Sequence, residues 1–310
     1  MADIVISEFM DQPAVDQLAS DYSVLYEPDL FERPQKLHEA LARARALIVR
    51  NRTRVDQPLL DAAPDLEAIG RLGVGLDNID IAACEARNIQ VLPATGANDA
   101  SVAEYVIGAA LTLWRGVFHA TAEVLAGEWP RDRLIGRELA GKRMGLVGFG
   151  SIGRMVAQRV RALDMTVVAF DPYVSGDDPA WAEVERCVTL EAVIRNADVV
   201  SVHVPLTPFT RGLIGRWALE RMKPDAVLIN AARGGIVDEA ALIEALRAGR
   251  LGGAALDVFE TEPLTAATAA RFKDLPNLLL TPHVAGPTRE SNARVAAVTA
   301  ANVRRVLEGG

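Results

Sequence analysis

The sequence has few cysteines and no long apolar run, and both absences limit what the protein can be. Its 310 residues include two cysteines, Cys84 and Cys187, which lie far apart and form no Cys-x-x-Cys pair. We therefore expect buried thiols in a reducing compartment, with no disulfide and no metal site. Asp3 and Glu8 interrupt the amino-terminal apolar stretch, so no signal peptide is visible, and no segment reaches membrane-spanning length. These features predict a cytoplasmic protein that does not associate with membranes.

Basic residues are also outnumbered. The chain has 33 Lys and Arg against 41 Asp and Glu, a formal net charge of −8, which argues against a nucleic-acid-binding surface. Half of the residues are hydrophobic and 24% are charged, the balance of an ordinary globular protein. Because 310 residues exceed what one hydrophobic core usually supports, we expect two domains.

A glycine-rich turn is the most informative feature that is present. Gly148, Gly150 and Gly153 follow the apolar run 144–147 at the spacing of a dinucleotide-binding fingerprint. The first glycine permits a tight turn, the second lets the backbone approach a pyrophosphate, and the third lets the helix pack on the strand. A Gly-x-Gly-x-x-Gly pattern alone is weak, because glycine-rich turns are common. Here a strand precedes it and a helix over 154–163 follows, which favours a nucleotide site at the helix N-terminus.

Asp171 ends the next predicted strand, residues 166–170. A carboxylate at this position accepts hydrogen bonds from the ribose hydroxyls of adenosine. It would repel a 2′-phosphate, and the next residues, Pro172 and Tyr173, provide no arginine to neutralise one. The sequence therefore favours NAD over NADP.

Apolar runs that alternate with helical stretches continue along the whole chain, a pattern typical of parallel sheets covered by helices. We predict an α/β fold with two doubly wound parallel-sheet domains, a flavodoxin-like substrate domain and a Rossmann NAD-binding domain. The strands are expected at residues 4–6, 24–26, 46–49, 66–69 and 91–92 in the first domain, and at 144–147, 166–170, 187–188, 199–203, 227–230, 253–258 and 278–281 in the second.

Residues 98–126 have the apolar periodicity of one long helix, which Gly127 would end. This helix could bridge the two domains, form a subunit interface, or do both. Because it leaves the first domain before the second begins, we expect the helical tail 291–307 to return to the first. The predicted domains are therefore residues 1–97 with 287–310, and residues 98–286.

Polar residues that follow strands in the second half are the candidate catalytic groups. Arg233 follows the strand 227–230, and a guanidinium there can hold a carboxylate through two parallel N–H bonds. The alternative is a surface arginine near a helix end. His283 follows the strand 278–281, and imidazole suits the proton transfer of alcohol oxidation, although a lone histidine is more often structural.

An acidic partner for this histidine is expected in the segment 257–263, where the chemistry alone does not choose between Glu260 and Glu262. His203 also ends a strand, and we interpret it as a residue that lines the cleft.

Taken together, these segments resemble the D-isomer-specific 2-hydroxyacid dehydrogenase family, close to its phosphoglycerate dehydrogenase-like branch. The resemblance covers nearly the whole chain. Besides the glycine-rich turn, it rests on RLGVGLDNID at 71–80, SVAE at 101–104, HVPLT at 203–207, NAARG at 230–234, ALDVF at 255–259 and TPH at 281–283.

The resemblance implies a role for each matching residue. His283 would be the acid/base, Glu262 its carboxylate partner and Arg233 the group that holds the substrate carboxylate. The substrate would also contact Val74, Gly75, Asn51 and Arg52. Cofactor contacts would come from Val74, Gly148, Gly150, Ser151, Ile152, Gly153, Asp171, Val204, Ala231, Ala232, Arg233, Asp257, His283 and Gly286. The family also implies a homodimer joined through the long helix.

The activity implied is NAD-dependent hydride transfer between a D-2-hydroxy acid, or its 2-oxo form, and nicotinamide. The segment 49–54 carries more arginine than a lactate-like substrate needs. If Arg52 points inward, a second anionic or polar group is expected on the substrate, as in sulfolactate, 3-phosphoglycerate or glycerate. Sulfolactate is preferred from the basic loop and the overall similarity, although solvated arginines are an equal alternative. A different class of function, an NAD(H)-sensing corepressor-like binding protein on the same scaffold, lacks a basic or tail-like segment to support it.

Overall fold

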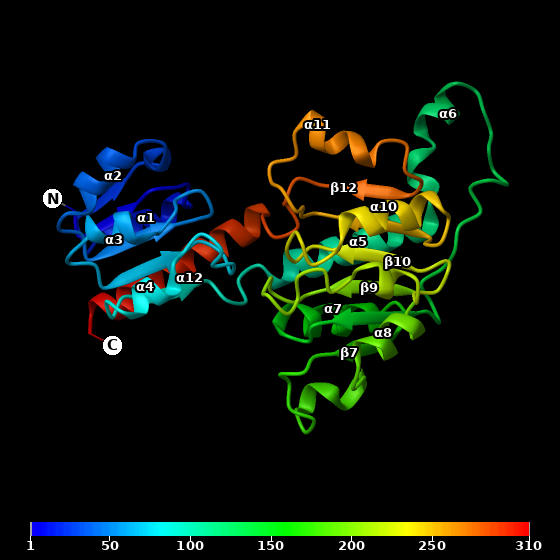
Figure 1. Ribbon diagram of the computed structural model, residues 1–310. Helices are drawn as coiled ribbons and strands as arrows, with labels where there is room; N and C mark the ends of the chain where they lie inside the picture. The colour runs from blue at the N-terminus through cyan, green and yellow to red at the C-terminus, as the bar shows by residue number, and fades with distance from the viewer. Residues whose placement is uncertain (1, 310) are drawn as a thin grey trace. The chain divides into compact units, whose positions relative to one another are not determined.

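The computed structural model describes residues 2–309, which form two compact units. One unit comprises the described residues up to Asn98 together with those from Pro287 onward, and the other is Asp99–Gly286. Each has its own parallel sheet with helices on both faces (Figure 1). The predicted α/β class with two doubly wound parallel sheets is therefore confirmed. Within residues 2–309, no helix combines the length and the apolar content needed to cross a bilayer.

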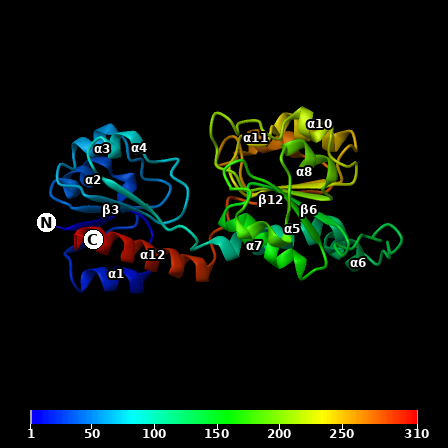
Figure 2. The same ribbon diagram turned by 90° about the horizontal axis from the view of Figure 1, so that it is seen from below.

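The first unit has a five-stranded sheet in the order β2-β1-β3-β4-β5. This is the strand order of flavodoxin-like folds. Helices α1 (Gln12–Ala19) and α12 (Arg289–Leu307) cover one face, and α2 (Pro34–Leu41), α3 (Gln57–Asp61) and α4 (Ile81–Glu85) cover the other (Figure 2). The strands are β1 (Ile4–Ile6), β2 (Val24–Tyr26), β3 (Ala46–Val49), β4 (Ala68–Arg71) and β5 (Gln90–Pro93), and a 3-10 turn spans Leu30–Glu32.

A glycine in β4 lets the C-terminal helix pack closely on this sheet. A Cβ atom on Gly70 would lie 2.7 Å from Val303 Cγ2 and 2.8 Å from Thr299 Cγ2, so no larger residue fits there without movement of α12. Val295, Val303 and Leu307 add apolar side chains to the same core. The tail thus belongs to the first unit although it follows the second in sequence.

The second unit has a seven-stranded sheet in the order β12-β11-β10-β9-β6-β7-β8. The order reverses between β6 and β9, as in a Rossmann fold, and ligands of such sheets bind where this reversal occurs. Helices α5 (Asp99–Arg115) and α7 (Ser151–Arg161) cover one face, and α8 (Leu190–Asn196), α9 (Arg216–Leu219) and α10 (Glu239–Arg247) cover the other. The strands are β6 (Arg143–Val147), β7 (Thr166–Phe170), β8 (Glu185–Arg186), β9 (Val199–Val202), β10 (Val227–Asn230), β11 (Gly253–Leu256) and β12 (Leu278–Leu280).

The prediction of one continuous helix over 98–126 is wrong. α5 ends at Arg115, because Gly116 adopts a left-handed conformation with φ of 63°. A 3-10 turn (Val117–His119) and the short helix α6 (Thr121–Leu125) follow, and Gly127, also with positive φ, comes after α6. The apolar periodicity continued past Gly116, so it did not reveal the break.

The strand predicted at 187–188 is also wrong, since the edge strand β8 is Glu185–Arg186. Cys187 N still donates to Ala169 O at 2.8 Å just beyond the strand. Both cysteines are free and buried, as expected. The remaining elements of the second unit are α11 (Ala266–Ala269) and two 3-10 turns, Pro179–Glu183 and Ala270–Phe272.

Candidate active site

The three predicted catalytic residues follow three neighbouring strands of the second unit. Arg233 comes after β10, Glu262 after β11 and His283 after β12, and these strands are adjacent in the sheet. Because the strands are parallel, the loops that follow them meet at the same edge. The buried Asn230 shapes the first of these loops, where its side chain donates to Arg233 O at 2.9 Å and accepts from Ala232 N at 3.1 Å.

His283 and Glu262 are in direct contact. His283 Nδ1 lies 2.7 Å from Glu262 Oε2, and the other carboxylate oxygen of Glu262 accepts a hydrogen bond from Phe259 N at 2.9 Å. The carboxylate thus fixes one ring nitrogen and leaves the other for a substrate. His283 has a left-handed backbone with φ of 55°, which is uncommon for a residue other than glycine and is often found at functional sites.

Two opposing effects act on the Glu262 carboxyl. Burial raises its pKa, but the hydrogen bonds from His283 and Phe259 N and the charges of His283 and Arg233 lower it by more in total. The pKa of Glu262 is therefore below its usual value, and the group is ionised at neutral pH. A fixed negative charge beside the imidazole stabilises its protonated form.

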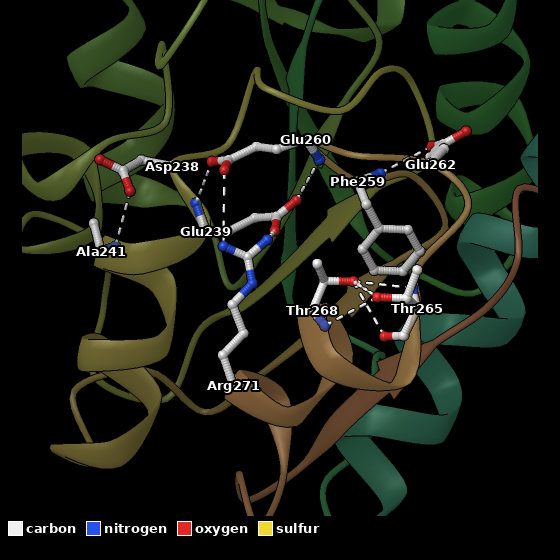
Figure 3. Close-up of polar contacts among 9 residues, drawn as sticks. All are labelled: Asp238, Glu239, Ala241, Phe259, Glu260, Glu262, Thr265, Thr268 and Arg271. Atoms are coloured by element: carbon white, nitrogen blue, oxygen red, sulfur yellow. Dashed lines mark hydrogen bonds and ion pairs between the residues drawn. The ribbon is translucent and has the colours of Figure 1, made fainter.

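The structure also decides between the two candidate acids, because Glu260 points toward α10 (Figure 3). Glu260 Oε1 accepts from Glu239 N at 3.2 Å, and Glu239 Oε1 accepts from Glu260 N at 2.6 Å. Glu239 is 2% exposed and forms an ion pair with Arg271. This reciprocal pair fixes the chain two residues before Glu262, so Glu260 has a structural contact and Glu262 has the histidine.

The loop that carries His283 is held by the buried Asp257. Its carboxylate accepts from Thr281 Oγ1 at 2.6 Å, Val284 N at 2.9 Å and Ala285 N at 2.8 Å, while Asp257 O accepts from His283 N at 2.8 Å. The resemblance implied a cofactor contact for Asp257. In the structure this side chain also fixes the backbone on both sides of the histidine.

The glycine-rich turn has the geometry that its sequence predicted. Gly148 has φ of 99°, and a Cβ atom there would lie 2.9 Å from the backbone of His203. A Cβ on Gly153 would lie 2.6 Å from Gly148 O, whereas one on Gly150 would meet nothing within 4 Å. The first and third glycines thus permit close packing, and the second leaves open space at the N-terminus of α7.

In the first unit, the expected substrate-binding residues follow the neighbouring strands β3 and β4. Asn51 and Arg52 come directly after β3 and are exposed, and Val74 and Gly75 follow β4. The loop after β4 is fastened by Arg71, a residue that our sequence analysis did not single out. Its guanidinium donates to Gly75 O at 2.7 Å and to Leu72 O at 2.6 Å.

Comparison with known proteins places the chain in a family. Residues 107–285 match the family described as D-isomer specific 2-hydroxyacid dehydrogenase, NAD binding domain. The chain belongs to this family. It is similar to the (S)-sulfolactate dehydrogenase of Chromohalobacter salexigens, with 54% identity over 307 residues and 99% of both chains covered. It is 39% identical to the D-3-phosphoglycerate dehydrogenase of Archaeoglobus fulgidus over 99% of its own length, but spans only 57% of that relative.

Solved structures of similar proteins agree. The TT0316 protein of Thermus thermophilus superposes with a TM-score of 0.88 at 34% identity, covering 99% of this chain and 97% of that one. D-lactate dehydrogenase of Aquifex aeolicus, solved with NAD and lactic acid, has a TM-score of 0.86 at 28% identity and covers 99% and 96%. The protein is thus an NAD-dependent oxidoreductase of 2-hydroxy acids, as the sequence predicted.

The residues of this 2-hydroxyacid dehydrogenase fit the cofactor. The open space at Gly150 and the uncapped N–H groups at the start of α7 suit a pyrophosphate. His203 Nε2 is buried without a hydrogen-bond partner among the described residues, and burial lowers the pKa of this histidine to about 4. Asp171 lies at the end of β7, where its carboxylate also accepts from Phe149 N at 2.8 Å and Tyr173 N at 2.9 Å.

The other expected cofactor residues divide between the two units. Those of the second unit all follow the carboxyl ends of strands, in line with the glycine-rich turn, whereas Val74 belongs to the first unit. The former are Ser151 and Ile152 at the start of α7, Val204 after β9, Ala231 and Ala232 after β10, and Gly286 after β12.

Proposed function

We propose that His283, Glu262 and Arg233 are the catalytic residues of this dehydrogenase. The observation that carries the proposal is the 2.7 Å contact between His283 Nδ1 and Glu262 Oε2 at the edge of the sheet where Arg233 also lies. His283 takes the hydroxyl proton in oxidation and returns it in reduction through Nε2, and Glu262 stabilises the imidazolium. Arg233 binds the substrate carboxylate through paired N–H bonds and so orients carbon 2.

NAD, when bound, accepts or supplies the hydride. Gly148, Gly150 and the first turn of α7 would hold its pyrophosphate, and the Asp171 carboxylate would accept hydrogen bonds from the ribose hydroxyls. The negative charge of Asp171 disfavours a 2′-phosphate, and Tyr173 places an exposed ring next to it where an NADP site has an arginine. We therefore propose NAD as the preferred cofactor.

The substrate is a D-2-hydroxy acid with a second anionic group, and sulfolactate is the first candidate. Arg52 is exposed, its guanidinium lies 5.1 Å from the ring centre of Phe31, and it has no ion pair with any of residues 2–309. With Asn51 it lines a cavity of about 460 Å³ that also contacts Glu8, Phe9 and Phe31. An arginine held in this way can bind a sulfonate or phosphate. The named activities of the similar proteins, on sulfolactate and phosphoglycerate, support the same class.

Steady-state rates with NAD and a panel of sulfolactate, 3-phosphoglycerate, glycerate and D-lactate test the substrate. We expect kcat/KM for at least one anionic substrate to exceed that for D-lactate by about a hundredfold, the effect of one charge-assisted contact of about 3 kcal/mol. Equal activity on D-lactate would remove the second anion site. The catalytic role of His283 is tested by comparing kcat in His283→Ala with kcat in His38→Ala, a substitution in α2 of the other unit. His283→Ala should lose most of the turnover, and His38→Ala should keep it.

A homodimer is the proposed assembly. Large apolar side chains are exposed along the segment 111–135 of the second unit, which includes the end of α5 and all of α6. Phe118 is 63% exposed, Leu125 83%, Trp129 77% and Ile135 77%, more than a monomer usually leaves in water along one segment. Sedimentation velocity measures the oligomeric state. The wild type should sediment as a dimer and Leu125→Glu as a monomer, and a monomeric wild type would contradict the proposal.

The alternative of a corepressor-like NAD(H) sensor is not favoured, because the similar proteins of Chromohalobacter salexigens and Archaeoglobus fulgidus are named dehydrogenases. The two free, buried thiols are consistent with the cytoplasm, which we propose as the location.

A further inference from the structure

A buried carboxylate lies directly beneath the arginine-rich loop of the first unit. Glu8, which follows β1, is 3% exposed. Its Oε1 accepts from Arg50 N at 2.8 Å and from Thr53 N at 2.9 Å, and its Oε2 accepts from Asn51 N at 3.2 Å and from Arg52 N at 3.0 Å. Four consecutive backbone N–H groups thus converge on one side chain.

Other contacts complete the fixation of this loop. Thr53 Oγ1 lies 2.8 Å from Ser7 Oγ, and Asn78 Nδ2 donates to Thr53 O at 2.6 Å. The Arg50 side chain turns toward α12, where it donates to Asn292 Oδ1 at 2.8 Å. The backbone of the loop is therefore held on both sides, and the side chains of Asn51 and Arg52 remain exposed.

We propose that Glu8 is a positioning residue that fixes the backbone of residues 50–53 and thereby orients Arg52 toward the second anionic group of the substrate. The inference rests on the proposed role of Arg52. Glu8 itself contacts the loop backbone, and it would act on the substrate only through Arg52.

The chemistry requires a carboxylate at this position. An ionised carboxylate offers about four lone-pair positions and no donor, which matches the four N–H groups. Glutamine has the same shape but would present an NH₂ group to two of these donors. The loop would then have two unsatisfied N–H groups, or move to satisfy them with water. Either outcome changes the direction of Arg52.

The kinetic test compares Glu8→Gln with Glu27→Gln, an acid of the same unit that is paired with Arg33 and Lys36. We expect Glu8→Gln to raise KM for the preferred anionic substrate about tenfold with less than a twofold change in kcat, and to leave the affinity for NAD unchanged. The preference for that substrate over D-lactate should fall by a similar factor. Glu27→Gln should behave as the wild type.

A double-mutant cycle tests whether Glu8 acts through Arg52. In an Arg52→Gln background, Glu8→Gln should have little further effect on KM, because the side chain that the loop orients is already absent. If the two changes multiply, or if kcat falls as much as kcat/KM for every substrate, the positioning role is wrong and Glu8 is only structural.

Hydrogen exchange provides a readout that does not depend on turnover. The amides of residues 50–53 should exchange slowly in the wild type and faster in Glu8→Gln. If this variant does not fold, Glu8→Asp keeps the charge but shortens the reach, and should give an intermediate increase. Unchanged exchange in a folded variant would overturn the inference. A wild type without preference for an anionic substrate would overturn the proposed substrate class instead, while the exchange rates would still test the contact of Glu8 with the loop.

Discussion

The substitution Glu262→Gln tests the central contact of the site. Glutamine keeps the size of the side chain but has one acceptor oxygen where glutamate has two. Glu262 uses both, Oε2 for His283 Nδ1 at 2.7 Å and Oε1 for Phe259 N at 2.9 Å. In either orientation of the amide, one of these hydrogen bonds is lost and the negative charge beside the imidazole disappears.

The size of the effect follows from the exposure of the pair. A hydrogen bond to a charged group contributes about 1.5–3 kcal/mol, and the lower value applies here because the two side chains are 45% and 33% exposed. We expect kcat/KM for 2-oxo acid reduction at pH 7 to fall about tenfold, since about 1.4 kcal/mol corresponds to that factor. Reduction requires the imidazolium form of His283, and the variant lacks the negative charge that stabilises this form. The rate of reduction should therefore begin to decline at a lower pH in the variant than in the wild type.

The assay is NADH consumption with a 2-oxo acid between pH 5 and 9. Hydrogen bonds and neighbouring charges outweigh burial and hold the pKa of Glu262 below its usual value, so in the wild type this group stays ionised across the range. The contribution of the ionised Glu262 carboxylate to the free energy of unfolding is present above the pKa of this group in the unfolded chain. It is lost only as the pH falls through the lower pKa of Glu262 in the folded protein. Glu260→Gln is the matched control and should leave the pH profile unchanged. If Glu262→Gln were within twofold of the wild type with the same profile, the contact would have no catalytic role.

Four further outcomes are expected. Arg233→Lys should lower kcat/KM for the 2-oxo acid about tenfold or more, because lysine cannot form two parallel N–H bonds; steady-state rates of NADH consumption check this. Gly150→Val should weaken NADH binding at least about tenfold, while the Tm without cofactor stays the same. The control is Gly108→Ala, a substitution in α5 at a glycine that also faces open space. Burial lowers the pKa of His203 to about 4, so the folded protein resists its protonation and the free energy of unfolding should fall by about 2 kcal/mol from pH 7 to pH 5; urea titrations of His203→Gln should show a flatter dependence. Glu239→Gln should reduce the free energy of unfolding by about 1 kcal/mol in the same assay, because it removes the ion pair with the partly exposed Arg271 but also the cost of burying the charge, which raises the pKa of Glu239.

The sequence predicted the sheet strands well where short apolar runs were bounded by polar residues. β1, β2, β3, β7 and β10 begin and end where the runs do. The sequence could not locate the break at Gly116, because apolar side chains continue beyond it and a single glycine is compatible with a helix. Its left-handed backbone depends on how the following segment packs.

The proposed catalytic residues differ in how far the sequence could identify them. Arg233 and His283 could be proposed because each lies in a loop that follows a strand, and loops at that edge of a parallel sheet carry function. Glu260 and Glu262 could not be separated by their chemistry. What separates them is Glu239, the first residue of α10, whose carboxylate accepts a hydrogen bond from Glu260 N at 2.6 Å. Such a contact joins positions that are distant in sequence, so no local sequence pattern predicts it.

Buried carboxylates that accept backbone N–H groups are a common feature of the loops in this protein. Glu8 accepts from residues 50–53, Asp257 from the loop of His283, and Glu239 from the loop of Glu262. All three are at most 3% exposed, and N–H dipoles oppose the cost of burying their charges. Glu239 also pairs with Arg271, although burial outweighs these contacts and raises the pKa of Glu239. The net charge of −8 therefore says little about the local charge near the proposed substrate-binding residues, Arg52 in the first unit and Arg233 in the second. An anionic substrate is compatible with an acidic protein because some of the acidic residues fix the loops that carry Arg52, His283 and Glu262.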